Sequence, residues 1–393
     1  MNGTEKGLSD RQLHVLTLTP FYPHECDEAD GCFISEPLAA LAQVGIANTV
    51  LALQPFYRKQ LRTARAGVPA EWLHYISLPG NIGLPTAGFF AFASIVGRIR
   101  ELHRKQHIDV IHAHAPFPAG HAAMLLGMEL ELPYVVSVHG LDAFSREHVS
   151  GRVGQWCARI ARRVYQASKR VICISEAVRK NVLQEMGTEC RTSVVYNGVD
   201  PHLFSPDDTS ACQDLTVLSV GNLIPTKGHD VLIRALAAIA PEFPKLRVQI
   251  IGDGPEKIRL QELAQQLGIS DCVRFLGRQS RTKIAEAMRT CTVFALPSSY
   301  EGLGCVYLEA MATAKPAVGC REQGIAEIIC QGSSGFLIGP GNDRELALVL
   351  GMLLRDERQR RNIGITARDT ILDRFTLEQQ AENLVRIYRE SAV

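Results

Sequence analysis

The chain has 393 residues, enough for two domains of ordinary size or possibly three. With 46% hydrophobic and 21% charged residues, it has the composition of a globular protein that can bury large cores. Its formal net charge of +1 gives no electrostatic reason to expect a nucleic acid as partner.

The cysteines and the apolar segments bear on the cellular compartment. Eleven cysteines are scattered along the chain, and several, such as Cys173 and Cys291, lie in apolar runs typical of buried, reduced thiols. The polar first ten residues do not resemble a signal peptide. The longest apolar patch, residues 84–97, contains a proline and is too short to span a bilayer. We expect a cytoplasmic protein, with peripheral contact at the inner face of a membrane left open.

The first half of the chain alternates between strand and helix patterns. We expect strands at residues 13–18, 49–53, 109–114, 134–138, 171–174 and 193–196, and helices at 33–44, 89–107 and 152–170, with another N-capped by Ser175. Residues 54–80 have no clear periodicity, and we expect them to be irregular. Such βα alternation predicts a parallel sheet covered by helices.

The turn after the first strand, residues 20–31, is longer than a dinucleotide-binding turn, and no G-x-G-x-x-G pattern occurs. Within it, Asp27-Glu28-Ala29-Asp30 spells a helicase motif. The chain has no G-x-x-x-x-G-K-[ST] phosphate loop, however, so an acidic solvated loop is the better interpretation.

Three segments of the first half are basic. For residues 54–80 we favour a solvated surface over a site for a substrate's phosphate. The expected helices at 89–107 and 152–170 have arginine-rich faces, and both should cover the sheet with their apolar sides. A membrane-facing surface is the alternative for both, and a site for an anionic substrate is a further alternative for the second.

Histidines follow two neighbouring strands. His112 and His114 point to the same side of their strand, and His121 follows on the next helix. A zinc site would need a further ligand, and no acid or cysteine stands at the required spacing. We therefore expect the two strand histidines to line a cleft at the carboxyl ends of the strands, where open α/β sheets bind ligands. His139 follows the next expected strand, 134–138, and a lone histidine in that position is often structural.

A break in the pattern, residues 197–206, separates two βα series. The second series predicts strands at 215–220, 247–251, 273–276, 292–296 and 336–338, and helices at 229–240, 306–314, 343–354, 357–372 and 377–390. Lys227 stands at a helix start, where the dipole disfavours a cation unless an anion binds there.

The most informative stretch is residues 297–312, Pro-Ser-Ser-Tyr-Glu-Gly-Leu-Gly-Cys-Val-Tyr-Leu-Glu-Ala-Met-Ala. Gly302 and Gly304 let the backbone approach a ligand, and a strand-to-helix turn of this kind suits a phosphate. Glu301 lies in the turn, beside the position of the phosphate's substituent. Glu309 lies two turns into the helix, where its carboxylate could accept sugar hydroxyls.

This stretch resembles glycosyltransferase family 4, whose retaining members carry a Glu-x7-Glu motif that Glu301 and Glu309 reproduce. The resemblance covers nearly the whole chain. It implies the α/β fold called GT-B, in which two Rossmann-like domains face each other across a cleft. Residues 1–198 would form the acceptor domain, joined by a returning carboxyl-terminal helix at 376–393. Residues 199–375 would form the donor domain.

The resemblance also implies roles for individual residues. Lys227 would stabilise the leaving diphosphate, Glu301 would orient the sugar hydroxyls, and His139, in a His-Gly-x-Asp element, would grip the donor sugar. The donor would be bound by Gly31, Gly221, Asn222, Gly252, Arg278, Gly302, Leu303, Gly304 and Glu309, with Glu309 on the ribose. The acceptor would be bound by His112, His114 and Asp142. Asn222 is a departure, because family members carry arginine there.

The implied activity is transfer of a sugar from a UDP- or GDP-linked donor to an acceptor hydroxyl, with retention at the anomeric carbon and no protein nucleophile. The acceptor would be a sugar, a lipid-linked sugar or a small molecule. The nucleotide-sugar is a co-substrate, so no cofactor is expected. No Asp-x-Asp metal motif occurs, so no metal is expected. Nothing in the sequence indicates the oligomeric state.

Three alternatives remain. A nucleotide-sugar epimerase of the same fold would need acid and base residues on both sides of the sugar. A two-lobed sugar-binding protein without catalysis would normally need export. A nicotinamide oxidoreductase is disfavoured, because neither half carries the dinucleotide fingerprint.

Overall fold

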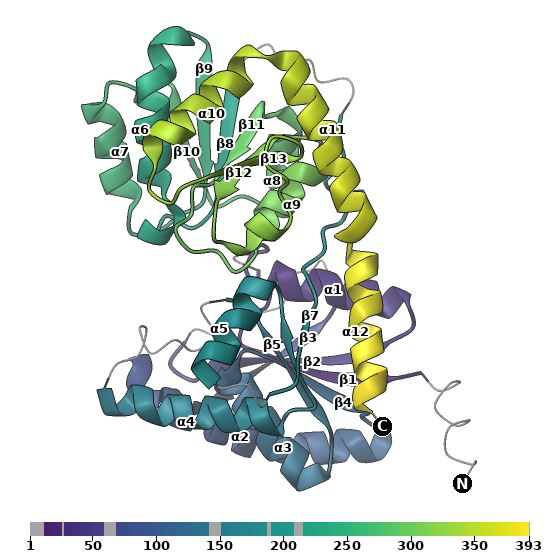
Figure 1. Cartoon of the computed structure of the whole chain (residues 1–393). Coiled ribbons are helices and arrows are strands. Elements are labelled where there is room, and N and C mark those ends of the chain that lie inside the picture. Colours follow the sequence, from purple (N-terminus) through teal and green to yellow (C-terminus); the bar gives the residue numbers. More distant parts are fainter. Residues whose placement is uncertain are drawn as a thin grey trace. The chain divides into compact units, whose positions relative to one another are not determined.

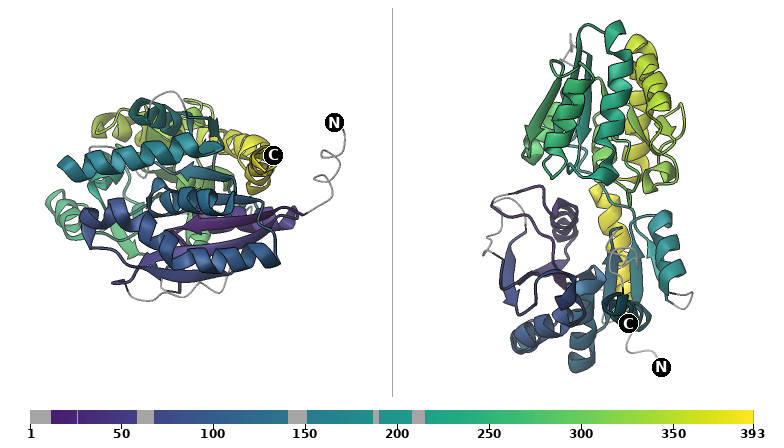
Figure 2. Two further views of the ribbon diagram at one scale, coloured as in Figure 1. Left: turned by 90° about the horizontal axis from the view of Figure 1, so that it is seen from below. Right: turned by 90° about the vertical axis from the view of Figure 1, so that its left-hand side faces the viewer.

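The computed structural model describes residues 12–25, 27–58, 68–140, 151–186, 190–207 and 215–392. The chain divides into two compact units, which Figure 1 labels by element. Unit 1 contains residues 1–196 and 378–393, and unit 2 contains residues 197–377. The purple start and the yellow end of the chain therefore belong to the same unit (Figure 2).

Unit 1 is built on a parallel sheet. Within the described residues its strands are β1 (His14–Thr19), β2 (Ala47–Pro55), β3 (Ala70–Tyr75), β4 (Val110–His114), β5 (Tyr134–Val138), β6 (Arg170–Cys173) and β7 (Thr192–Val194). Their order is β3-β2-β1-β4-β5-β6-β7, and all neighbouring pairs are parallel. Strands β1, β4 and β5 are buried along their whole length, as expected for the centre of a sheet covered on both faces.

Helices cover this sheet. Those described are α1 (Cys32–Gln43), α2 (Leu84–Lys105), α3 (His121–Leu130), α4 (Gly151–Ala167), α5 (Glu176–Met186) and α12 (Leu377–Ser391). Ser175 caps α5 as predicted, since its hydroxyl accepts a hydrogen bond from the Val178 N–H at 3.1 Å. The order reverses between β1 and β4, which makes the carboxyl ends of these strands the place where such sheets bind ligands.

Unit 2 repeats the plan. Its described strands are β8 (Leu215–Val220), β9 (Leu246–Ile251), β10 (Val273–Gly277), β11 (Val293–Ala295), β12 (Ala317–Cys320) and β13 (Gly335–Ile338). Its described helices are α6 (His229–Ile239), α7 (Lys257–Gln266), α8 (Arg281–Thr290), α9 (Cys305–Ala312), α10 (Asp343–Arg355) and α11 (Glu357–Arg374). The parallel order is β10-β9-β8-β11-β12-β13, with the reversal between β8 and β11. Its core is one cluster of aliphatic side chains drawn from these strands and helices.

One sequence expectation is wrong. Residues 54–80 are not wholly irregular, because β3 forms at Ala70–Tyr75 and pairs with β2. The segment was missed because β3 is an edge strand. Five of its six residues are only partly buried, so its sequence lacks the apolar run that identifies an interior strand.

Candidate active site

The carboxyl edge of the unit 2 sheet is assembled by close contacts between glycine-bearing loops. A Cβ atom on Gly252 would lie 1.9 Å from the Gly221 carbonyl oxygen, and one on Gly228 would lie 2.1 Å from the Pro297 oxygen. Gly252 and Gly228 also have positive φ angles of 141° and 67°. No other residue type fits these positions. The loops after β8, β9 and β11 therefore meet as bare backbone at the point where the strand order reverses.

An ion pair lies on this edge. The Lys227 Nζ atom, at the end of a single 3₁₀ turn (η4, Pro225–Lys227), is 2.5 Å from Glu301 Oε2. Both side chains are largely buried, with 20% and 14% of their surfaces exposed. The Ser298 hydroxyl donates to the same carboxylate oxygen at 3.5 Å. Lys227 and Glu301, both predicted to act on the donor, are thus in direct contact.

The backbone of Glu301 is held by a side chain that sequence analysis did not assign. The Glu301 N–H donates to Gln323 Oε1 at 2.8 Å, and Gln323 Nε2 donates to the Ser299 carbonyl at 2.9 Å. A Cβ on the neighbouring Gly324 would lie 1.9 Å from the Gly302 oxygen, so this loop also packs as bare backbone. Gln323 fixes the turn between β11 and α9.

Helix α9 begins directly after this turn. Its N-cap is Gly304, with a φ of 83°, and no side chain caps the helix. A Cβ on Gly304 would lie 2.5 Å from the Tyr307 ring, and the Tyr307 hydroxyl donates to the Leu296 carbonyl. The N-terminus of α9 therefore presents backbone N–H groups and the positive end of the helix dipole, an arrangement that favours an anion.

A second ion pair lies one helix turn beyond. Glu309 on α9 is only 2% exposed, and its Oε1 atom is 2.6 Å from Arg281 Nη1 at the start of α8. The Arg281 guanidinium stacks 4.9 Å from the centre of the Phe204 ring. The other oxygen, Oε2, is buried and receives no hydrogen bond from any described residue. A buried carboxylate oxygen without a donor is an acceptor ready for a ligand hydroxyl.

Arg281 was missed by sequence analysis, although a signal was present. A cation in the first turn of a helix is unfavourable unless something negative lies nearby. The same reasoning had selected Lys227.

The carboxyl edge of unit 1 has a different character, because it carries a row of three histidines, of which His112 and His114 are buried and His139 is partly buried. Both ring nitrogens of His112 are hydrogen-bonded: Nδ1 lies 2.7 Å from the Tyr388 hydroxyl and Nε2 lies 2.7 Å from the Ser137 hydroxyl. His114 Nδ1 is 2.9 Å from His139 Nε2, and their rings stack with centres 5.2 Å apart. Phe33, on α1, packs on the His139 ring with centres 4.8 Å apart.

These imidazoles are neutral at physiological pH. Burial lowers the pKa of His112 and of His139 from the ordinary value of 6.5 to about 3, and it lowers the pKa of His114 well below its usual range. Each therefore carries one N–H donor and one acceptor but no charge, and both nitrogens of His112 are already used by Tyr388 and Ser137.

Known proteins resemble this chain along almost its whole length. Residues 206–370 match the model for glycosyl transferases group 1, and residues 33–203 match the model for glycosyltransferase family 4. An uncharacterised glycosyltransferase of Methanocaldococcus jannaschii is 30% identical over 293 residues, which cover 74% of this chain and 78% of that protein. The chain belongs to glycosyltransferase family 4.

Two other proteins similar to this family 4 member bear on its fold and chemistry. D-inositol 3-phosphate glycosyltransferase of Stackebrandtia nassauensis is 30% identical, over 77% of this chain and 72% of its own. The crystal structure of Anabaena HepE in complex with UDP superposes with a TM-score of 0.74 at 22% identity, covering 95% and 99% of the two chains. The predicted GT-B fold, with two Rossmann-like domains, is confirmed.

The other predicted site residues of this family 4 glycosyltransferase lie on the same two edges. In unit 2, Asn222 and Arg278 are exposed in the loops after β8 and β10. Gly302 and Leu303 are buried in the turn before α9. In unit 1, Gly31 is the left-handed N-cap of α1, and a Cβ there would meet the Tyr22 nitrogen at 2.6 Å. Asp142 lies outside the described residues.

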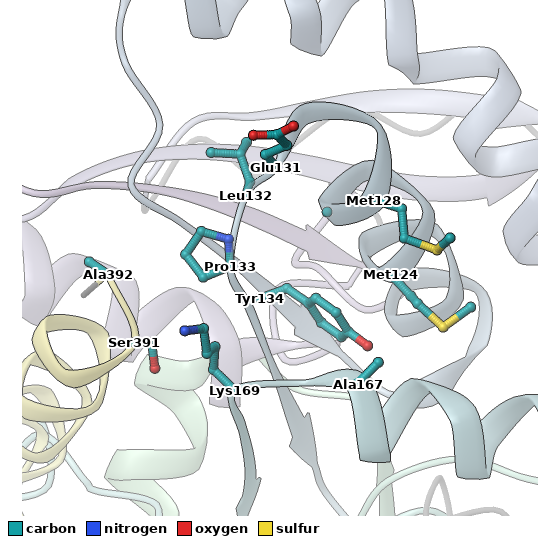
Figure 3. Close-up of a pocket in the computed structure, with 11 residues that line it drawn as sticks. Met124, Met128, Glu131, Leu132, Pro133, Tyr134, Ala167, Lys169, Ser391 and Ala392 are labelled. Atoms are coloured by element: carbon teal, nitrogen blue, oxygen red, sulfur yellow. The ribbon is translucent and has the colours of Figure 1, made fainter.

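An open pocket of about 490 Å³ lies elsewhere in unit 1 (Figure 3). Its lining includes Met124, Met128, Tyr134, Ala167 and Lys169. Tyr134 begins β5 and Lys169 precedes β6, so the pocket opens at the amino ends of these strands, away from the histidine row.

The described residues contain no helix that is both long and apolar enough to cross a bilayer. In the same part of the chain, no group of three or more His, Cys, Asp or Glu side chains is arranged to hold a metal ion.

Proposed function

We propose that this family 4 glycosyltransferase moves a sugar from a UDP-sugar to an acceptor hydroxyl, retains the anomeric configuration and needs no metal ion. One observation carries the proposal. Lys227, Glu301 and the uncapped N-terminus of α9 share one edge with a buried Glu309 oxygen that receives no hydrogen bond from the described part of the chain. A cation and backbone donors for a diphosphate thus stand beside acceptors for hydroxyl groups.

The diphosphate would be the leaving group. Breaking the sugar–phosphate bond develops negative charge on its oxygen, and preorganised donors aimed at that charge usually make the largest catalytic contribution. Lys227 has three N–H donors, and Glu301 occupies one of them, so the ammonium can donate to a phosphate as well. The backbone of Gly302–Gly304 and the Arg278 guanidinium would add donors. Together they take the place that a divalent ion would otherwise fill.

The ribose would bind at Glu309. Oε2 would accept from the ribose hydroxyls, while Arg281 holds Oε1 from the other side. The Phe204 ring limits where Arg281 can move. Arg281 is thereby a positioning residue, since it acts on the nucleotide through Glu309.

The sugar would lie between the diphosphate and Glu301. Because Gln323 fixes the Glu301 backbone, the carboxylate can orient sugar hydroxyls without moving its chain. No protein nucleophile is proposed. The acceptor hydroxyl attacks the anomeric carbon from the same face that the diphosphate leaves, and an oxygen of the leaving diphosphate takes the hydroxyl proton. The roles of His139 with the donor sugar and of His112, His114 and Asp142 with the acceptor stay predictions.

The comparisons support a choice of substrates. HepE was crystallised with UDP, which supports uridine as the base. The Stackebrandtia relative is named for D-inositol 3-phosphate, which supports a phosphorylated polyol as the first acceptor to test.

The base is tested by the thermal stability of the protein with UDP, GDP or ADP, because a ligand that binds the folded state raises the apparent unfolding temperature. We expect the largest rise with UDP, also in the presence of EDTA. Equal shifts with all three, or none, would contradict the proposed donor.

The reaction is tested by NMR of the product formed from an α-linked UDP-sugar and the polyol phosphate. An α-linked product is expected, and a β-linked product would rule out retention. Conversion of the donor to an epimer without any acceptor would show instead that the enzyme is an isomerase.

A further inference from the structure

Positive charge is concentrated on one group of helices in unit 1. Helices α2, α3 and α4 pack against one another on one side of the sheet (Figure 1). They carry eight arginine and lysine residues and only two glutamates. By contrast, α1 has one glutamate and no basic residue, and α12 has three glutamates and two arginines. A chain of formal charge +1 is therefore strongly polarised.

Most of the charge on α2 is already neutralised. Arg98 pairs with Glu71, Arg100 with Glu129 and Lys105 with Glu101. Such exposed pairs add little to stability, but they reduce the field that an approaching partner meets.

Helix α4 is the exception. It contains no acidic residue, and its four arginines (152, 159, 162 and 163) form no ion pair with any described residue. All four are exposed. Since the spacings 152–156–159–163 follow the helical repeat, Arg152, Trp156, Arg159 and Arg163 form one stripe along the outer face. We call these four residues the α4 stripe.

The α4 stripe includes an exposed tryptophan. Half of the Trp156 surface is accessible, while the opposite side of the helix buries Cys157, Ala161 and Val164 in the unit. Tryptophan is enriched at membrane–water interfaces, where its apolar ring and polar N–H are both satisfied.

The carboxyl end of α4 adds apolar surface. Ala167, its last residue, lines the open pocket together with Met124 and Met128, and Met128 is 75% exposed (Figure 3). Lys169 lies at the same pocket. An unpaired cationic helix face with an indole and a methionine-lined hollow at its end matches a surface of anionic headgroups over acyl chains.

We propose that the α4 stripe binds the surface of an anionic lipid bilayer. The guanidinium groups contact lipid phosphates, and the Trp156 indole lies at the level of the headgroups. Binding is peripheral and reversible, and it depends on ionic strength. This surface is separate from the nucleotide site and does not depend on the identity of the donor.

The test uses the full chain with vesicles of phosphatidylcholine alone or with about one-third phosphatidylglycerol, a lipid whose charge attracts basic helices. The sequence has two tryptophans, so Trp72→Phe leaves Trp156 as the only indole reporter. We expect its emission to shift to the blue with the anionic vesicles only, and the shift to be lost in about 0.5 M salt, where screening is strong.

A matched pair of variants makes the proposal specific. Arg159→Glu/Arg163→Glu is expected to weaken vesicle binding at least about tenfold, since four units of charge change on the stripe. Arg358→Glu/Arg361→Glu makes the same change at two exposed arginines of α11 and should bind like wild type. Unfolding temperatures and UDP-induced shifts of both variants should match wild type. If the stripe variant fails this folding check, Arg159→Gln/Arg163→Gln replaces it.

Three results would overturn the proposal. These are wild-type binding by the stripe variant, equal loss in the α11 variant, and an unshifted Trp156 spectrum on anionic vesicles. Binding of single-stranded RNA through the stripe without vesicle binding would assign the surface to a nucleic acid instead.

Discussion

The carboxyl edges of the two sheets occupy equivalent places in two similar folds, yet they are chemically opposite. Unit 2 presents ion pairs, Lys227 with Glu301 and Arg281 with Glu309. Unit 1 presents the hydrogen-bonded imidazoles of His112, His114 and His139, which burial keeps neutral. The topology brings loops together at each edge, and the side chains there decide which ligand chemistry that edge could bind.

The contrast has a simple physical meaning. Charge that develops on a leaving diphosphate needs fixed cations and backbone donors, which the edge of unit 2 has. Neutral sugar hydroxyls would instead need paired donors and acceptors. Uncharged imidazoles could supply these without charge that must be desolvated, except that both nitrogens of His112 already bond to Tyr388 and Ser137. The predictions below test whether the two edges differ in this way.

The largest effect is expected at Lys227. Lys227→Ala removes the cation from the unit 2 edge, and turnover should fall about a hundredfold, the scale for losing one donor to a developing oxyanion. Steady-state kinetics measures this. Lys283→Ala removes an exposed lysine of α8 and serves as the control. If Lys227→Ala turns over like wild type, the ammonium has no part in the reaction.

Arg281 should affect nucleotide affinity. Arg281→Ala leaves Glu309 buried without its partner, and we expect the Kd for UDP to rise about tenfold or more, as for other buried pairs that lose one member. Calorimetric titration gives the value. Adding Glu309→Gln should restore stability without restoring affinity. Recovery of both in the double variant would show that the pair is only structural.

The unit 1 edge should make stability depend on pH. A histidine whose pKa is lower in the folded than in the unfolded state binds fewer protons when the protein is folded. The free energy of unfolding is therefore unaffected by this histidine above pH 6.5, and it falls as the pH drops from 6.5 towards 3. Each such group contributes about 1.4 kcal/mol per pH unit within that window.

Calorimetry at pH 7 and pH 5 should therefore show a marked drop in the unfolding temperature. Hydrogen exchange should show unit 1 opening before unit 2, which has a smaller effect of this kind at His229. His139→Asn should reduce the slope of stability against pH. A slope unaffected by this change would contradict the assignment to the histidine row.

The smallest effect is expected at Asn222, where family members carry arginine. Asn222→Arg adds a cation to an exposed position in the loop after β8, and turnover should stay equal or rise by a few-fold. Kinetics with the same donor and acceptor measures it. Loss of turnover in this variant would mean that the phosphate-binding residues are arranged differently from the family pattern.

Much of the fold could be predicted because its interior strands are apolar runs that end just before a glycine or proline, as in β1, β8 and β11. β3 could not, because an edge strand needs no apolar run. In the candidate site, Glu301, Glu309 and Lys227 were predicted from their places around glycine-bearing turns together with the family resemblance. Arg281 and Gln323 were not, because their roles arise from contacts 28 and 22 residues away in the sequence.

Unit 1 is made from both ends of the chain, and this has a consequence for its synthesis. Tyr388, fully buried on α12, supplies one of the two hydrogen bonds to His112. A ribosome releases all of unit 2, residues 197–377, before that tyrosine emerges. Unit 2 can therefore finish folding before unit 1, which waits for the residues of α12.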